Sequence, residues 1–321
     1  MLVHEPANMV FNVPRGASLD QTLARLEKEH ILGSAFLTRL YIKLTGNAPL
    51  IKAGDYQFAS PINAYGVLDT LRKGGIEPIK LTIIEGWTRY EIADAMVKIP
   101  SLKLTRKDAL KLMDDVSLVK DFDPKAANLE GYLFPDTYFV ESDTKAKQLI
   151  TEMVQRFRQV MNGLFKNHGN PEKRSPHDLV VAASVIETEA KLAAERPVVA
   201  SVIYNRLKIG MPLAMDSTIV YASKLAGKWK GNGIVYQSDL DLRSPYNTRK
   251  YKGLPPGPVS SPGESSLKAA LLPANTGFIY YVRDPDFNDG KHNFYVDATG
   301  FEAGVAKLRR WEATQKAAGR R

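Results

Sequence analysis

The sequence predicts an α+β protein, with a small β-α-α-β module at residues 9–80 and a larger mixed α/β domain at residues 81–321. Three observations support this prediction. The chain has 321 residues, which is longer than a usual single domain. Its composition, with 44% hydrophobic and 25% charged residues, is that of an ordinary globular protein. Stretches of period-2 alternation and stretches of helical spacing follow one another along the chain.

The N-terminal module is predicted from four consecutive patterns. Residues 9–13 alternate like a strand, and helical spacing then runs through residues 19–31. A second helix is expected at about residues 34–43, with a return strand at 51–58. This β-α-α-β order resembles the LysM-like modules that bind N-acetylated glycans. A packing module that binds no ligand is the alternative.

The second domain begins with a helix, a strand and another helix, expected at residues 62–72, 79–84 and 89–97. Residues 98–125 then show an amphipathic helical pattern without an evident chemical motif. The segment at residues 128–138 carries Glu130, Asp136 and several aromatic residues on a backbone broken by Gly and Pro, so no regular element is expected there. Aromatic faces and acids on loops suit sugar binding. Alternatively, the aromatic rings fill the core.

An amphipathic helix at residues 144–165 leads through a polar linker to the best-defined helix of the chain, at residues 175–190. Its start is marked by Ser175, a good N-cap residue, followed by proline at the first helical position. After its polar first turn, this helix is almost entirely apolar until its last few residues. A charged residue on such a helix needs a reason to be there, and Glu187 and Glu189 are the two carboxylates near its end.

Glu187 lies on the shoulder of the predicted buried face of this helix. Glu189 is about 160° away around the same helix, so the two carboxylates cannot point into one pocket. A half-desolvated carboxyl group has a raised pKa and therefore stays protonated at neutral pH, as a general acid must. The alternative is that Glu187 is a surface residue at the edge of a core helix.

Three further segments carry polar candidates. A helix at residues 195–207 places Asn205 on its buried face, where the amide needs a partner from the fold or from a ligand. Asp216 precedes a helical run and is either a site carboxylate or an N-cap. The segment 244–273 is stiffened by Pro and Gly, and it offers Tyr246, Asn247 and Thr248 together before a helix that starts at Ser265 or Ser266.

The chain ends with two alternating strands, at residues 278–282 and 293–296, and a C-terminal helix with a basic tail. No cysteine is present, which excludes disulfides, Cys metal sites and a thiol nucleophile. The net charge of +9 suggests an anionic partner: a nucleic acid, an acidic membrane surface or a carboxylate-bearing polymer. The basic residues are spread along the chain without an aromatic-interleaved helix face, which argues against nucleic acid.

No signal peptide is expected in the first ten residues, and the longest apolar run, residues 179–186, is far shorter than the roughly 20 residues of a membrane span. The chain as written is expected to be soluble.

Several ordered blocks together resemble the endolytic murein transglycosylases of the YceG-like (MltG) family, over nearly the whole length. The blocks are LEGYLFPDTY at 129–138, ASVIETEA at 183–190, VIYNRLKIGMPL at 202–213, SPYNT at 244–248, GLPPGPVSSPG at 253–263 and SLKAALLP at 266–273.

The resemblance implies that Glu187 is the catalytic glutamate. Such enzymes cleave the β-1,4 bond between MurNAc and GlcNAc within glycan strands and leave a 1,6-anhydro-MurNAc end, which would terminate strand elongation. One acid suffices, because the sugar's own C6 hydroxyl attacks C1. Neither a metal nor an organic cofactor is implied.

The resemblance also implies a saccharide groove, a cellular location and partners. The candidates for lining the groove are Glu130, Asn205, Asp216, Tyr246, Asn247 and Thr248. Departures from the family pattern are found at Ser217, Arg249 and Phe301-Glu302, which affects the substrate contacts that can be expected. The implied partners are peptidoglycan strands and the penicillin-binding synthases. The implied location is the periplasmic side of the inner membrane, with anchoring by an N-terminal helix that this sequence lacks.

Two other functions are compatible with the sequence. The first is a murein hydrolase in which Glu130 or Asp216 acts as a second carboxylate that activates water. The second is a glycan-binding scaffold without enzymatic activity.

Overall fold

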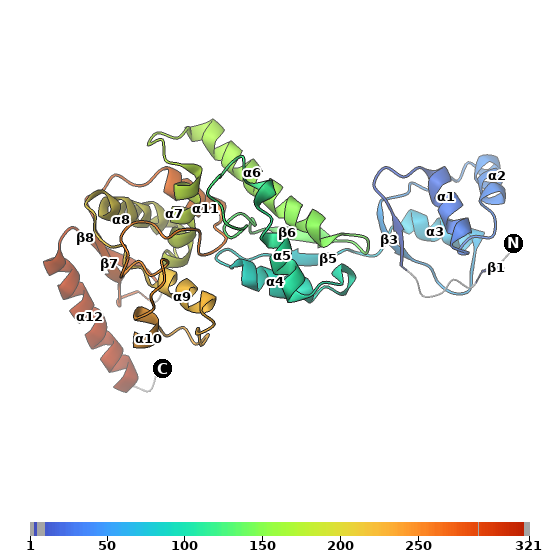
Figure 1. Cartoon of the computed structure of the whole chain (residues 1–321). Helices are drawn as coiled ribbons and strands as arrows, with labels where there is room; N and C mark the ends of the chain where they lie inside the picture. Colours follow the sequence, from blue (N-terminus) through green and yellow to red (C-terminus); the bar gives the residue numbers. More distant parts are fainter. Residues whose placement is uncertain (1–2, 5–9, 288, 318–321) are drawn as a thin grey trace. The chain divides into compact units, whose positions relative to one another are not determined.

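The computed structural model describes residues 3–4, 10–287 and 289–317, and it is a mixed α/β structure as predicted (Figure 1). Its contacts divide it into two compact units. The first contains the residues up to Leu81 together with residues 96–104 and 137–149. The second contains residues 82–95, 105–136 and those from 150 onward. Met9, the predicted start of the first module, and the basic tail at 318–321 lie outside the described residues.

The first unit has the predicted β-α-α-β order. Strands β2 (Val10–Val13) and β3 (Gly54–Gln57) pair antiparallel, and helices α1 (Leu19–Lys28) and α2 (Ala35–Thr45) connect them. Both helices begin at a serine N-cap, and α2 ends at Gly46, whose left-handed φ of 68° favours glycine. The buried core of this unit is built from residues of both strands and of α1, including Phe11, Val13, Leu23, Leu26 and Tyr56.

Three elements extend this unit. Strand β1 (Val3–His4) pairs with β4 (Ile62–Asn63), and α3 (Ala64–Lys73) follows directly. The helix predicted from residue 62 therefore begins two residues later, because β4 takes up its first two positions. Asn63 then caps α3 by accepting a hydrogen bond from the backbone N–H of Gly66 (2.9 Å).

The next elements are strands β5 (Ile79–Thr82) and β6 (Thr137–Val140), which pair with each other. Helices α4 (Arg89–Val97), α5 (Arg106–Met113) and α6 (Ala146–His168) are accompanied by short 3-10 turns at Pro100–Leu102 and Val116–Leu118.

The segment at residues 128–138 is irregular only as far as residue 136, since β6 starts at Thr137. Tyr132, Phe134 and Tyr138 are buried. The expectation that these aromatic rings bind sugar is therefore wrong, and the alternative, that they fill the core, is correct.

Helix α7 (Pro176–Glu189) lies at the centre of the second unit and contacts α8 (Arg196–Lys208), α9 (Asp216–Leu225) and α11 (Glu264–Leu271). Every residue from Leu179 to Glu187 is buried. A helix that is apolar around its whole circumference needs neighbours on all sides, and α7 has them.

The remaining elements complete the second unit. A 3-10 turn at Ala193–Glu195 precedes α8, and α10 (Gln237–Leu240) follows α9. The hairpin of β7 (Tyr280–Arg283) and β8 (His292–Tyr295) packs against α12 (Ala298–Ala317), as Figure 1 shows. Within the described residues, no helix is both long and apolar enough to cross a membrane.

Candidate functional site

The last turn of α7 carries two carboxylates, Glu187 and Glu189, in different surroundings. Only 3% of the Glu187 side chain is exposed. Its Oε1 accepts a hydrogen bond from Arg196 Nη2 at 2.7 Å, and its Oε2 accepts one from the backbone N–H of Gly263 at 2.9 Å. Burial raises the pKa of Glu187, while the Gly263 N–H and the Arg196 charge act in the opposite direction.

The ion pair of Glu187 belongs to a tightly packed junction. Arg196, at the start of α8, also reaches Glu85 Oε2 at 3.3 Å. A Cβ at Gly263 would lie 1.9 Å from Glu85 Oε1, so only glycine fits there without rearrangement. Glu187 thus connects α7, α8 and the start of α11, and both of its oxygens are engaged with the protein.

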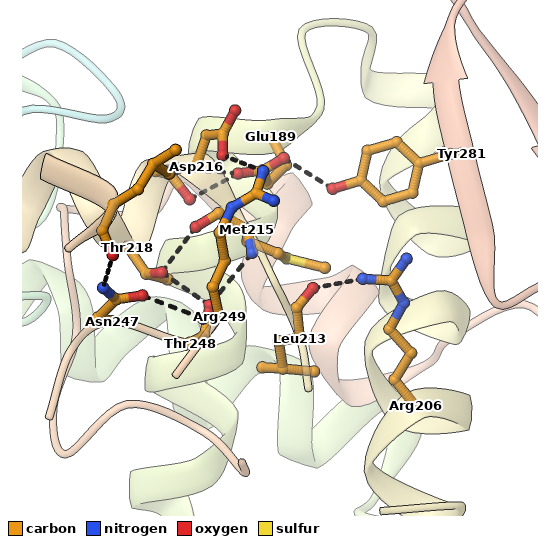
Figure 2. Close-up of polar contacts among 12 residues, drawn as sticks. Glu189, Arg206, Leu213, Met215, Asp216, Thr218, Asn247, Thr248, Arg249 and Tyr281 are labelled. Carbon is orange, nitrogen blue, oxygen red and sulfur yellow. Dashed lines mark hydrogen bonds and ion pairs between the residues drawn. The ribbon is translucent and has the colours of Figure 1, made fainter. Parts of the chain in front are cut away.

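Glu189 is partly exposed and meets different partners (Figure 2). One oxygen accepts hydrogen bonds from the backbone N–H and the hydroxyl of Ser217, at 3.2 and 2.7 Å. The other accepts one from the Tyr281 hydroxyl at 2.7 Å. Burial, and then the charge of Glu189, raise the pKa of Tyr281 well above its ordinary value, so this hydroxyl remains a donor at neutral pH.

Glu189 lines a pocket of about 380 Å³ that Glu187 does not line. The walls come from the loop before α4, the end of α7, the exposed side of α9 and two loop segments. The lining residues are Gly86, Thr88, Thr188, Glu189, Asp216, Ser217, Val220, Tyr221, Lys224, Gly233, Val235 and Val259. This volume lies within the range of small-ligand sites, about 300–1,000 Å³.

Asp216 shares this pocket with Glu189. It is the first residue of α9 and not its N-cap, which is Met215. The alternative that Asp216 is only an N-cap is therefore wrong. Its carboxylate pairs with Arg249 at 2.7 Å, and both side chains are about half exposed. Arg249 is one of the predicted departures from the family pattern, and its role here is to pair with Asp216.

Asn247 and Thr248 are buried and bind the protein (Figure 2). The Asn247 amide donates to the carbonyl groups of Leu240 and Leu242, at 2.9 and 3.0 Å. Thr248 Oγ1 accepts from the Met215 N–H at 3.1 Å. The Thr248 bond links the segment that carries Arg249 to the start of α9, which carries Asp216. Neither Asn247 nor Thr248 lines the pocket.

The three other predicted groove residues do not line the pocket. Asn205 donates to the carbonyl groups of Thr276 and Phe278, at 2.8 and 2.9 Å, so the fold itself satisfies this amide. The Tyr246 ring packs 4.9 Å from that of Tyr221.

Glu130 is 2% exposed and accepts from the Arg89 N–H and the Tyr221 hydroxyl, both at 3.0 Å. Burial raises the pKa of Glu130 to about 8. Its position beneath Tyr221 makes it a support for the pocket wall.

Sequence reasoning had missed Glu189, Ser217 and Tyr281 as a group. The sequence Glu187-Thr188-Glu189 indicates a turn of the helix with two carboxylates, but it does not indicate which of the two lines a pocket. Tyr281 comes from a strand 92 residues away, and no local pattern connects it to Glu189. In the described part of the chain, no group of three or more His, Asp or Glu residues is arranged to hold a metal ion.

Comparisons with known proteins agree on one family. The model of the YceG-like family matches residues 11–307. A Bacillus subtilis protein named endolytic murein transglycosylase is 34% identical over 287 residues, which cover 84% of this chain and 77% of that protein. A Streptococcus pneumoniae protein of the same name is 28% identical, and this chain spans only 53% of its length.

A crystal structure of a yceG-like protein from Listeria monocytogenes has a similar fold. It is 33% identical in sequence, with a TM-score of 0.61, and the match covers 92% of this chain and 98% of the other.

Proposed function

The chain belongs to the YceG-like family, and we propose that it is an endolytic murein transglycosylase whose general acid and base is Glu189. The observation that carries the choice of residue is exposure. A general acid must come within hydrogen-bond distance of the oxygen that it protonates. Glu189 is partly exposed and lines a pocket, whereas the Glu187 side chain is almost fully enclosed. The oxygens of both carboxylates accept hydrogen bonds from the protein, so exposure alone separates them.

In the proposed reaction, Glu189 donates a proton to the glycosidic oxygen between MurNAc and GlcNAc as the bond from that oxygen to C1 breaks. The Glu189 carboxylate then takes the proton of the MurNAc C6 hydroxyl, and the C6 oxygen bonds to C1. The products are a GlcNAc with a free 4-hydroxyl and a 1,6-anhydro-MurNAc end. Ser217 and Tyr281 orient the carboxylate through the hydrogen bonds described above.

The sequence-based assignment of the acid to Glu187 remains a prediction. It requires the Arg196 pair to open before a substrate can reach the carboxylate, and breaking a buried pair costs several kcal/mol. The geometry favours Glu187 as a structural anchor. Glu189 is the better candidate for contact with the sugar.

A second function has a specific observation in its favour. Asp216 lines the same pocket as Glu189, and a hydrolase needs two carboxylates on opposite sides of the bond. Asp216 forms an ion pair with Arg249 on the side of α9 that faces this pocket. The products distinguish the two functions, because a hydrolase leaves reducing ends. Glu130, the alternative second carboxylate, is buried and accepts a hydrogen bond from the Tyr221 hydroxyl.

We also propose that residues 9–80 form a glycan-binding module separate from a catalytic domain at residues 81–321. A pocket of about 230 Å³ in this module is lined in part by Tyr41 and Tyr65, whose rings offer stacking faces for sugars. If the whole protein were a scaffold, it would bind glycan strands without cleaving them.

The proposed setting is the periplasmic face of the inner membrane, next to the penicillin-binding synthases that make the strands. The net charge of +9 suits a wall polymer that carries carboxylates. Cutting a nascent strand internally would end its elongation.

The decisive experiment is mass spectrometry of muropeptides released from purified sacculi by the wild type, Glu189→Gln and Glu187→Gln. We expect anhydro-ended products from the wild type, none from Glu189→Gln, and products from Glu187→Gln at temperatures where that variant is folded. Cleavage by Glu189→Gln at the parental rate would overturn the assignment. Reducing ends from the wild type would support the hydrolase, and binding without cleavage would support the scaffold.

A further inference from the structure

A second pocket, of about 360 Å³, adjoins the Glu189 pocket and shares Lys224 with it. It lies between α4, the start of α5, α9 and the turn after α9. Its lining residues are Tyr90, Glu91, Asp94, Arg106, Lys224, Leu225, Gly227 and Trp229. The two cavities therefore form neighbouring compartments along α9.

The border between the compartments is a fixed group of three side chains. Lys224 Nζ pairs with Glu91 Oε1 at 2.5 Å, and the other Glu91 oxygen accepts the Thr88 N–H at 2.9 Å. Thr88 lines the first pocket and Glu91 lines the second. An ammonium group has three donors, so Lys224 can hold Glu91 and still donate to a ligand that crosses the border.

Two aromatic residues line the second pocket. Tyr90 and Trp229 are each partly exposed. The guanidinium groups of Arg89 and Arg106 lie 5.2 and 5.5 Å from the centre of the Tyr90 ring, and Arg106 also bonds Asp94 at 2.6 Å. These contacts fix the Tyr90 ring in place. Partly exposed aromatic faces beside polar groups suit the apolar face of a sugar ring and its hydroxyls.

The charges of the pocket indicate the kind of ligand. Its two cations, Lys224 and Arg106, are each paired with an acid of the same pocket, Glu91 and Asp94. The lining therefore carries no net charge, which favours a neutral ligand over a phosphate or a peptide carboxylate.

We infer that the second pocket is a distal subsite that binds an uncharged N-acetylhexosamine of the glycan strand, one or more sugars away from the bond that is cut. The inference rests on the proposed function, since an enzyme that cuts within a strand must hold sugars beyond the reacting pair. Trp229 is its main stacking surface, and Lys224 guides the strand from one pocket to the other.

The first test is kinetic. We expect Trp229→Ala to raise KM for long murein strands about fivefold, which corresponds to the loss of about 1 kcal/mol of aromatic stacking, and to leave kcat nearly unchanged. Substrates too short to reach the second pocket should show no change in KM. Trp229→Phe should retain most of the affinity for long strands. Trp311→Ala, on α12 and in neither pocket, is the matched control.

The second test is binding of chitin hexasaccharide, an uncharged N-acetylglucosamine polymer, followed by tryptophan fluorescence and calorimetry. Binding that Trp229→Ala weakens at least fivefold, with an unchanged melting temperature, would support the subsite even if the wild type cleaved no murein. In that case only the proposed reaction would fail. A KM change of the same size for short and long substrates, or hexasaccharide binding that does not respond to Trp229→Ala, would overturn the inference.

Discussion

Replacing Glu187 by Gln should destabilise the second unit strongly, because it leaves Arg196 without its closest acid in a buried junction. Removing one partner of a buried ion pair costs about 3–5 kcal/mol. We expect the lower end of this range, about 3 kcal/mol, for two reasons. Glu85, half exposed and 3.3 Å from Arg196, provides partial compensation. A glutamine oxygen can also still accept the Gly263 N–H.

This loss is large enough to measure by calorimetry. For a domain of this size, 1 kcal/mol shifts the melting temperature by about 2–4 °C, so Glu187→Gln should melt about 6–12 °C lower than the wild type. Glu302→Gln, an exposed substitution of the same type on α12, is the matched control and should change stability by less than about 0.5 kcal/mol.

The same variant also separates the two candidate acids. At a temperature well below its melting point, Glu187→Gln should cleave murein within tenfold of the wild-type rate, whereas Glu189→Gln should lose a factor of about 10²–10⁴. A Glu187→Gln variant with wild-type stability and no cleavage would refute the structural role. It would restore Glu187 as the acid.

Three further predictions concern the surroundings of the site. Thr248→Val removes the acceptor for the buried Met215 N–H and should cost about 1–3 kcal/mol in urea unfolding, with Thr248→Ser as the control that keeps it. Arg249→Ala breaks an exposed pair with Asp216 and should change stability by less than about 1 kcal/mol, whereas a loss above 2 kcal/mol would contradict this. Since the pKa of Glu130 is raised from 4.5 to about 8, its contribution to stability is complete below pH 4.5 and is lost as pH rises to about 8. Unfolding of Glu130→Gln across this range should lack that component.

Local signals in the sequence were sufficient for most of the elements. Ser175 followed by proline predicts the start of α7, and the structure has Ser175 as its N-cap. The question raised by Asn205, whether the fold or a ligand satisfies its amide, is answered by two backbone carbonyl groups about 70 residues away. Such a partner has no local signature in the sequence. The start of α3 was misplaced because it depends on the pairing of β4 with β1, a contact between distant segments.

The choice between Glu187 and Glu189 was beyond a helical wheel for a physical reason. A wheel separates a buried face from an exposed one, but α7 is buried around its whole circumference up to Glu187. For such a helix, a helical wheel predicts the angle between two side chains, but it does not predict which side chain faces solvent. The wheel correctly predicts that the two carboxylates point apart. Which one meets a pocket depends on α9 and β7, which supply Ser217 and Tyr281.

The two carboxylates at the end of α7 can therefore have different roles in one site, with Glu187 supporting a pocket wall and Glu189 transferring the proton. The loop before α4, which forms one wall of the Glu189 pocket, is held to the segment before α11 by hydrogen bonds from the Gly86 N–H to the Ser261 carbonyl and from the Ser261 N–H to the Trp87 carbonyl. Glu187 fixes that same segment through the Gly263 N–H. In the proposed assignment Glu187 holds the pocket wall through the Gly263 N–H. Glu189, about 160° away around the same helix, exchanges the proton with the sugar while Ser217 and Tyr281 hold its carboxylate in position.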